Sequence, residues 1–157
     1  MKLNLIRDSN DVISGYVNID PYGKSESVVI HSYENLDDIA ENAQCTDIIA
    51  RDVIDYIEPL NIDNVLRHWL SKLRINGKIT ISGTDLMSVC EKYVEGAFDA
   101  DVATALIYGE RTESHKYKKN ASTLENVVRF LEMCGFQIIL KSLNSDLTYT
   151  VQAQRMR

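Results

Sequence analysis

The sequence lacks long hydrophobic runs and has few cysteines, and each absence excludes a class of protein. No apolar stretch approaches the roughly 20 residues that cross a bilayer, and the first residues do not resemble a signal peptide. We therefore expect neither a membrane span nor secretion. The three cysteines, Cys45, Cys90 and Cys134, are odd in number and widely spaced. They predict reduced thiols in a cytoplasmic protein, with no disulfide framework and no metal site.

The composition is that of an ordinary globular protein. The chain has 157 residues, 45% of them hydrophobic and 25% charged, which predicts a single domain over residues 1–157. The net charge of −6 is uneven: residues 1–63 hold 13 acids and 4 bases, a net of −9, and residues 64–157 hold 10 acids and 13 bases, a net of +3. This balance argues against a nucleic-acid partner for the first half. The basic run at 115–119 is typical of a solvated loop.

Short apolar segments with long connections between them predict the strands of a parallel sheet covered on both faces. The predicted strands are residues 2–5, 15–19, 27–31, 47–50 and 78–82. The segments 136–143 and 147–154 are also rich in β-forming residues, and the turn formers at 144–146 predict that they form a hairpin.

Helices are predicted between these strands from apolar spacing and from capping residues. They cover residues 36–42 after Asn35, a broad apolar stripe at 62–73 followed by Gly77, two short segments at 88–94 and 101–108, and a segment from the capping-box pair Ser122 and Glu125 to Gly135. The order of elements predicts an α/β fold: a three-layer sandwich with a Rossmann-like, mostly parallel sheet and a C-terminal antiparallel hairpin.

In such a sheet the ligand binds beyond the carboxyl ends of the strands. The residues after the predicted strands are therefore the candidates: Ile6–Asn10, Asp20, His31–Leu36, Arg51-Asp52 and Gly83–Asp85. Asp20 has two interpretations that its position leaves open. An acid after the second strand can accept hydrogen bonds from ribose hydroxyls. An Asp before Pro21 can equally open a turn.

Four segments in this order resemble the small class I S-adenosylmethionine (SAM)-dependent methyltransferases. They are Lys2–Leu5 with Gly15–Asp20, Asp47–Ile57, Trp69–Ile79 and Leu131–Phe136. The relatives typically read "LNLGCG…GYVNVD", "DxIxasHVLEHI", "WxRVLKPGGxLxIsvPD" and "LxxaGF". The resemblance covers nearly the whole chain, and it implies the class I methyltransferase fold, SAM as the cofactor and a methyl acceptor, either a small molecule or a macromolecule, that the sequence does not identify.

The chain departs from the family in its ligand-contacting loops. Ile6-Arg7-Asp8 stand where relatives have "GCG", whose glycines let the backbone pass close to the methionine part of SAM. Asp52, Asp55 and Tyr56 replace the usual His, Glu and His, and Thr84-Asp85 replace Pro-Asp. If the first loop keeps the family's path, its side chains are expected to occupy the methionine end of the cleft and weaken SAM binding. Asp8 could instead meet the ammonium of SAM.

The resemblance and the strand ends together suggest roles for individual residues. Cofactor contacts are expected from Asp8, Asp20, Leu36 and Arg51, and proton transfer from Asp52 or His115. An exposed, inert side chain is the alternative for His115. The expected function is SAM-dependent methyl transfer to an unknown acceptor, favoured by the retained Asp20. The alternative is a catalytically inactive methyltransferase-fold module for binding or assembly, favoured by the missing glycines. Oligomeric state is not predicted.

Overall fold

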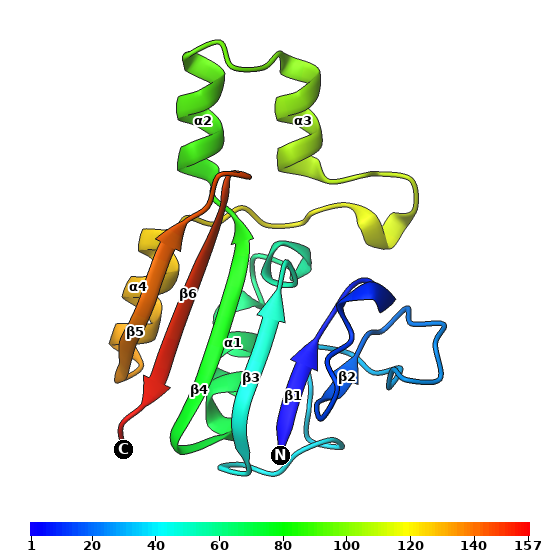
Figure 1. The fold of residues 1–157 in the computed structure, drawn as a ribbon, viewed down its shortest axis with the longest axis vertical. Helices are drawn as coiled ribbons and strands as arrows, with labels where there is room; N and C mark the ends of the chain where they lie inside the picture. Colours follow the sequence, from blue (N-terminus) through cyan, green and yellow to red (C-terminus); the bar gives the residue numbers. More distant parts are fainter.

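The computed structural model describes residues 1–157, and its core is a six-stranded sheet (Figure 1). The strands are β1 (Lys2–Leu5), β2 (Val17–Ile19), β3 (Cys45–Arg51), β4 (Leu73–Thr84), β5 (Phe136–Leu143) and β6 (Thr148–Arg155). Their order is β2-β1-β3-β4-β6-β5; β1 to β4 pair in parallel, and β6 is antiparallel to both β4 and β5. The predicted α/β class, parallel sheet and C-terminal hairpin are confirmed.

The strand predicted at 27–31 is wrong. Only one bridge forms there, between Val29 and Ile19, with hydrogen bonds from Val29 N–H to Asn18 O (2.7 Å) and from Asp20 N–H to Val29 O (3.1 Å). The partner strand β2 is three residues long, so it offers too short an edge for a longer ladder. The sheet therefore has four parallel strands where the sequence predicted five.

Four α-helices connect the strands: α1 (Ile62–Lys72), α2 (Leu86–Val94), α3 (Ala100–Tyr108) and α4 (Leu124–Met133). Three short 3₁₀ helices lie in the loops: η1 (Ser9–Asp11), η2 (Ile54–Tyr56) and η3 (Ser114–Lys116). The stripe of α1 is buried as predicted, but α1 runs straight into β4, so Gly77 lies inside that strand. None of the helices has the length and apolarity that a membrane span requires.

Two predicted helix starts differ from the structure. The cap of α4 is Thr123, whose hydroxyl accepts from Asn126 N–H, one residue after the predicted Ser122. The helix predicted at 36–42 is absent: residues 37–39 form a single turn, in which Leu36 O accepts from the amides of Ile39 and Ala40. The next amides do not continue a helical pattern, because Glu41 N–H donates to Gln44 Oε1 and Ala43 N–H donates to Ser71 O.

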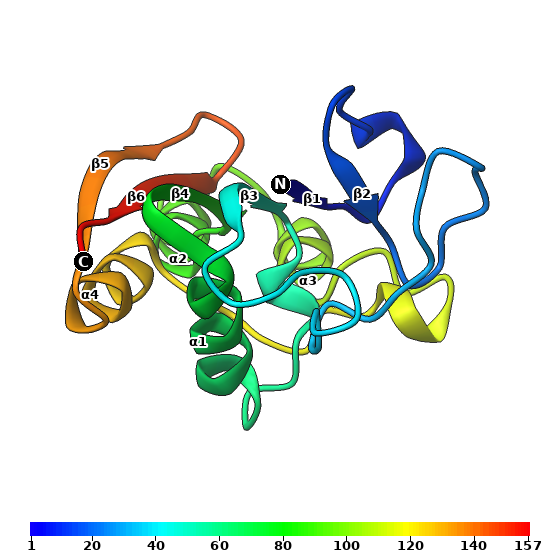
Figure 2. The same ribbon diagram turned by 90° about the horizontal axis from the view of Figure 1, so that it is seen from below.

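The long helices α1 and α4 both lie on the same face of the sheet, as Figure 2 shows from below. The expected coverage of both faces, with three layers, is therefore corrected. The reason lies in the alternation of β4 and β6, where buried apolar side chains such as Ile79 and Val151 alternate with partly exposed polar ones such as Thr80 and Gln152. A strand with this pattern packs against helices on one side only and faces water on the other.

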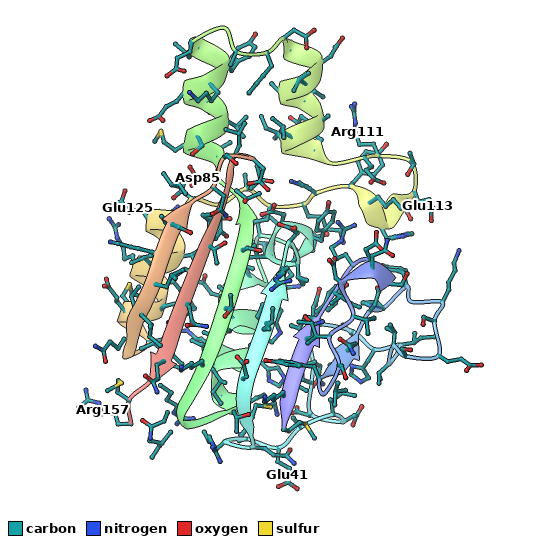
Figure 3. The ribbon with its side chains drawn as sticks, viewed as in Figure 1. Glu41, Asp85, Arg111, Glu113, Glu125 and Arg157 are labelled. Atoms are coloured by element: carbon teal, nitrogen blue, oxygen red, sulfur yellow. The ribbon has the colours of Figure 1, made fainter.

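Beyond the carboxyl ends of the strands, α2 and α3 project as a helical pair above the sheet (Figure 1). Asp85 lies where β4 passes into α2 (Figure 3) and is 2% exposed. Its Oδ2 accepts from the N–H and the hydroxyl of Ser88 (2.8 and 2.7 Å), which caps α2. Its Oδ1 accepts from Leu124 N–H (2.9 Å) at the start of α4. One carboxylate therefore fixes the starts of two helices.

Asp85→Ala is expected to lower the free energy of unfolding by about 2–3 kcal/mol, since it removes the cap of α2 and leaves the partly buried Leu124 N–H at the start of α4 without its acceptor. The matched control is Asp99→Ala, because Asp99 is an exposed cap that accepts only from Val102 N–H at the start of α3. That variant is expected to lose about 1 kcal/mol. Urea denaturation measures both, and equal losses would contradict the double role of Asp85.

Candidate functional site

A cleft of about 370 Å³ opens beyond the carboxyl ends of β1 and β2, which is within the usual size range of ligand pockets. Five parts of the chain form its walls: Arg7 after β1, the loops Asp20–Tyr22 and Ile30–Glu34, Tyr56-Ile57 at the end of η2, and His115, Lys116 and Lys119 around and after η3. This is the position at which the sequence predicted a ligand site.

Asp20 follows β2 directly and is only 6% exposed, although it borders the cleft. Its Oδ1 accepts from Tyr22 N–H (2.9 Å), so the residue shapes the turn before the loop, as one of the two interpretations required. Tyr33, from the opposite wall, donates through its hydroxyl to Ile6 O. Burial raises the pKa of Tyr33, and the negative charge of Asp20 adds to that rise. Asp20 is thus a carboxylate fixed by its hydrogen bond from Tyr22 N–H at the inner end of the cleft.

Of the three residues that stand where relatives have Gly-Cys-Gly, only Arg7 lines the cleft. Ile6 continues the pairing of β1, since its N–H donates to Ile19 O (2.9 Å), and its side chain is buried. The guanidinium carbon of Arg7 lies 3.0 Å from the ring centroid of Tyr56, inside the cleft. Asp8 caps η1 by accepting from Asn10 N–H (2.9 Å) and borders a neighbouring hollow of about 460 Å³. The expectation that all three side chains fill the cleft is corrected to Arg7 alone.

Two of the residues that line the cleft come from distant segments and form a stacked pair. The rings of Tyr22 and His115 lie 4.0 Å apart between centroids, at an interplanar angle of 19°. His115 Nε2 lies 3.6 Å from a carboxylate oxygen of Glu113, which Figure 3 shows on the segment after α3. The stack therefore joins the loop after β2 to η3 at the wall of the cleft.

A second polar group lies nearby, at the carboxyl ends of β3 and β4. Asp55 is buried, its Oδ2 accepts from Thr84 N–H (3.1 Å), and the same oxygen lies 3.4 Å from Lys118 Nζ. Its Oδ1 has no hydrogen-bond partner. Burial raises the pKa of Asp55, and the charge of Lys118 opposes that rise. This buried pair ties the segment after α3 to the sheet.

Asp52 lies in the turn that directly follows β3. Its φ of 54° is left-handed, and its N–H donates to Ser82 O (3.0 Å). The residue is exposed as a whole, yet desolvation of its carboxyl group raises its pKa, and repulsion from Asp55 raises it further. A raised pKa suits a proton acceptor near neutral pH. Asp52 does not, however, line the cleft.

The structure brings together only part of the predicted site. Asp20 and His115 line one cleft, and Asp8 borders the hollow beside it. Leu36 is fully buried in the core, and its N–H donates to His68 Nε2 (2.8 Å), so its side chain does not reach the cleft. Arg51 is exposed at the end of β3 and also lies outside the lining.

The sequence did not identify Tyr22 or Lys119 as cleft residues, whereas Tyr33 lies in the candidate segment His31–Leu36. Tyr22 follows an Asp-Pro pair and Lys119 belongs to a basic run, but neither signal points to a ligand. Tyr56 carried a signal, because it stands at an altered position of a family motif. Its contact with Arg7 needed the fold, since 49 residues separate the two in the sequence.

Comparison with solved structures identifies the fold. A SAM-dependent methyltransferase from Methanosarcina mazei matches with a TM-score of 0.64 and 12% identity, over 99% of this chain and 92% of that one. One from Archaeoglobus fulgidus matches with a TM-score of 0.64 and 11% identity, over 98% and 85%. The 1,6-didemethyltoxoflavin-N1-methyltransferase of Burkholderia thailandensis, solved with S-adenosylhomocysteine and its substrate, matches with a TM-score of 0.60 and 12% identity, over 90% and 61%. No family model and no curated protein matches the chain.

Proposed function

We propose that this chain, which has the class I methyltransferase fold, binds SAM in the cleft and transfers its methyl group to an acceptor. The observation that carries the proposal is the placement of Asp20. It is a buried carboxylate directly after β2, at the inner end of a cleft of about 370 Å³. An acid in that position is the group that takes ribose hydroxyls in sheets of this topology. The structural neighbours with the same fold are SAM-dependent methyltransferases.

The residues present fit the two halves of SAM differently. The nucleoside half finds Asp20 for the ribose, with Tyr22, Ile30 and Ile57 as flat or apolar walls for a base. The methionine half meets the Arg7 side chain, which lies against Tyr56. Because Ile6 and Asp8 point elsewhere, the donor end opens when this one side chain moves. The site therefore fits SAM once the Arg7 side chain is displaced. We expect SAM to bind more weakly here than in a site whose first loop is lined by glycines.

In this proposal, bound SAM supplies an activated methyl group, and the chain supplies position. Asp20 orients the ribose, and the stack of Tyr22 on His115 holds both rings at the wall of the cleft. Holding donor and acceptor in line can provide most of the acceleration of a direct transfer. Of the two predicted bases, His115 lines the cleft and Asp52 does not, so we assign acceptance of the acceptor's proton to His115.

The test is calorimetry with SAM and with S-adenosylhomocysteine, its demethylated product. Asp20→Asn is expected to weaken both by roughly tenfold or more, because a charge-assisted hydrogen bond is worth about 1.5–3 kcal/mol. The control is Asp101→Asn, an exposed carboxylate on α3 outside the cleft, which should leave both affinities unchanged. Unchanged affinity in Asp20→Asn would mean that this acid serves only the turn.

The Arg7–Tyr56 contact favours a second candidate, a module of the same fold that binds or assembles without methyl transfer. No heat from SAM at millimolar concentration, in the unmodified protein and in Arg7→Gly alike, would support the module. The acceptor, a small molecule or a macromolecule, stays open under the first candidate. A cytoplasmic location also stays a prediction, supported by three free cysteines.

A further inference from the structure

Arg7 is a cation without an anionic partner. None of the ion pairs in the structure includes it, although Asp8 is its neighbour in sequence and Asp20 borders the same cleft. Its guanidinium group lies against the Tyr56 ring instead, at 3.0 Å from the centroid. Lys116 and Lys119 differ, since they pair with glutamates outside the cleft. A partly desolvated guanidinium with no carboxylate is available to an anion from outside the chain.

The topology fixes which part of a nucleoside Arg7 would meet. β1 and β2 are adjacent and parallel, so the residues after them lie side by side at the same edge of the sheet. In nucleotide-binding sheets the turn after the first strand faces the group on the 5′-carbon, and the acid after the second strand takes the ribose hydroxyls. With Asp20 at the ribose, Arg7 lies on the 5′ side.

The charge of the cleft points the same way. Its lining has three basic side chains, Arg7, Lys116 and Lys119, against two acids, Asp20 and Glu34, in a chain whose net charge is −6, and of the three bases only Arg7 is in no ion pair. SAM carries a positive sulfonium directly on its 5′-carbon, and Arg7 would repel that charge; the carboxylate of SAM lies farther away, at the end of the methionine chain and beside an ammonium group. A phosphate on that carbon would instead be attracted, and a guanidinium can bind it with two parallel hydrogen bonds.

We propose that the cleft binds nucleoside 5′-phosphates, with Arg7 as the phosphate ligand, and that these anions compete with SAM. This inference rests on the nucleoside-binding role proposed above for Asp20. On binding, the Arg7 side chain leaves Tyr56 and pairs with the phosphate, while the ribose stays on Asp20. The Arg7 guanidinium group, which weakens the binding of the cationic sulfonium of SAM, is thus the group that favours an anionic ligand.

The experiment is calorimetry on the whole chain with four probes: 5′-AMP, adenosine, inorganic phosphate and SAM. In the unmodified protein, 5′-AMP should bind at least tenfold more tightly than adenosine, phosphate or SAM, and it should displace SAM. In Arg7→Ala the affinity for 5′-AMP should fall to that for adenosine, while SAM binding tightens. Arg7→Lys should retain part of the preference as a point charge. The control Arg74→Ala changes an exposed arginine at the far end of β4 and should alter nothing.

Thermal unfolding without ligand checks that each variant is folded. The inference is overturned if 5′-AMP binds no more tightly than adenosine, if free phosphate binds as well as 5′-AMP, if none of the probes binds, or if Arg7→Ala weakens SAM and 5′-AMP equally. SAM binding without a preference for 5′-AMP would reject this inference and leave the proposed function standing. A preference for 5′-AMP that depends on Arg7, with no heat from SAM even in Arg7→Ala, would support this inference and reject the proposed function.

Discussion

Lys118→Met is expected to lower the free energy of unfolding by about 3–5 kcal/mol at pH 7, because it leaves a buried carboxylate without its counter-charge. The side chains of Lys118 and Asp55 are 13% and 2% exposed, and Lys118 Nζ also donates to Thr84 Oγ1 (2.6 Å) and to Leu106 O (3.0 Å). Without the ammonium group, Asp55 keeps one bond from Thr84 N–H, and its other oxygen already has no partner. Urea denaturation measures the loss.

The loss should depend on pH, with a sign that follows from Asp55. Burial raises its pKa above the unfolded value of 3.8, and Lys118 opposes the rise, so removing Lys118 raises this pKa further. A group with a raised folded pKa stabilises the fold below the unfolded pKa, and that contribution is lost as pH rises through the folded one. The deficit of Lys118→Met should therefore be small near pH 4 and grow toward neutral pH.

The neighbouring residue supplies the control. Lys119 pairs with Glu58 at 3.2 Å, but both side chains are about half exposed, so Lys119→Met is expected to cost less than about 1 kcal/mol. The double variant Asp55→Asn, Lys118→Met removes both charges and should recover part of the loss. A deficit that is independent of pH, or equal in the two lysine variants, would contradict the buried-pair argument.

Arg7→Gly is expected to tighten SAM binding on the order of a hundredfold, from a dissociation constant of about 0.1 mM or weaker in the unmodified protein. The change removes the side chain that lies against Tyr56, removes a positive charge near the sulfonium and gives the backbone the freedom of the family's glycines. Calorimetry with SAM measures it. Micromolar binding by the unmodified protein would reject occlusion, and so would an unchanged affinity in the variant.

The structure sharpens this experiment beyond what the sequence suggests. From the sequence alone, the natural variant is the triple change Ile6→Gly, Arg7→Cys, Asp8→Gly. Ile6 is buried, however, so Ile6→Gly would leave a cavity and reduce stability without opening the cleft. Ile6→Gly alone is therefore the control: it should lose stability and leave SAM binding weak.

Much of the fold could be predicted because the spacing of apolar residues along a helix or strand reflects which of its sides is buried between the sheet and the helices. The apolar stripe of α1 and the alternation of apolar and polar residues in β6 each indicate which side of the element faces the core. The segment 36–42 could not be predicted, since Asn35 caps a turn and a helix with the same hydrogen bond to Asp37 N–H. The single helical layer was predictable in principle, because β4 alternates apolar and polar side chains from Ile79 onward.

The site was predictable where it depends on strand ends and not where it depends on packing between distant segments. Asp20 could be located because it ends a strand. Ile6 is buried and Arg7 lines the cleft because of strand geometry. The chain continues extended through Ile6, and consecutive side chains of an extended chain point to opposite sides. The stack of Tyr22 on His115 joins residues 93 positions apart, and no local pattern encodes such a pair.

The sheet has one face that is not covered by helices. The candidate cleft lies at the edge beyond β1 and β2, and α1 and α4 pack on the opposite face. The outward side chains of β4 and β6, such as Thr80 and Gln152, contribute to neither, although Gln152 Nε2 donates to Thr80 Oγ1 (3.1 Å). A fluorophore or spin label on this face, away from that bonded pair, would therefore report on the sheet without touching the cleft or the helices.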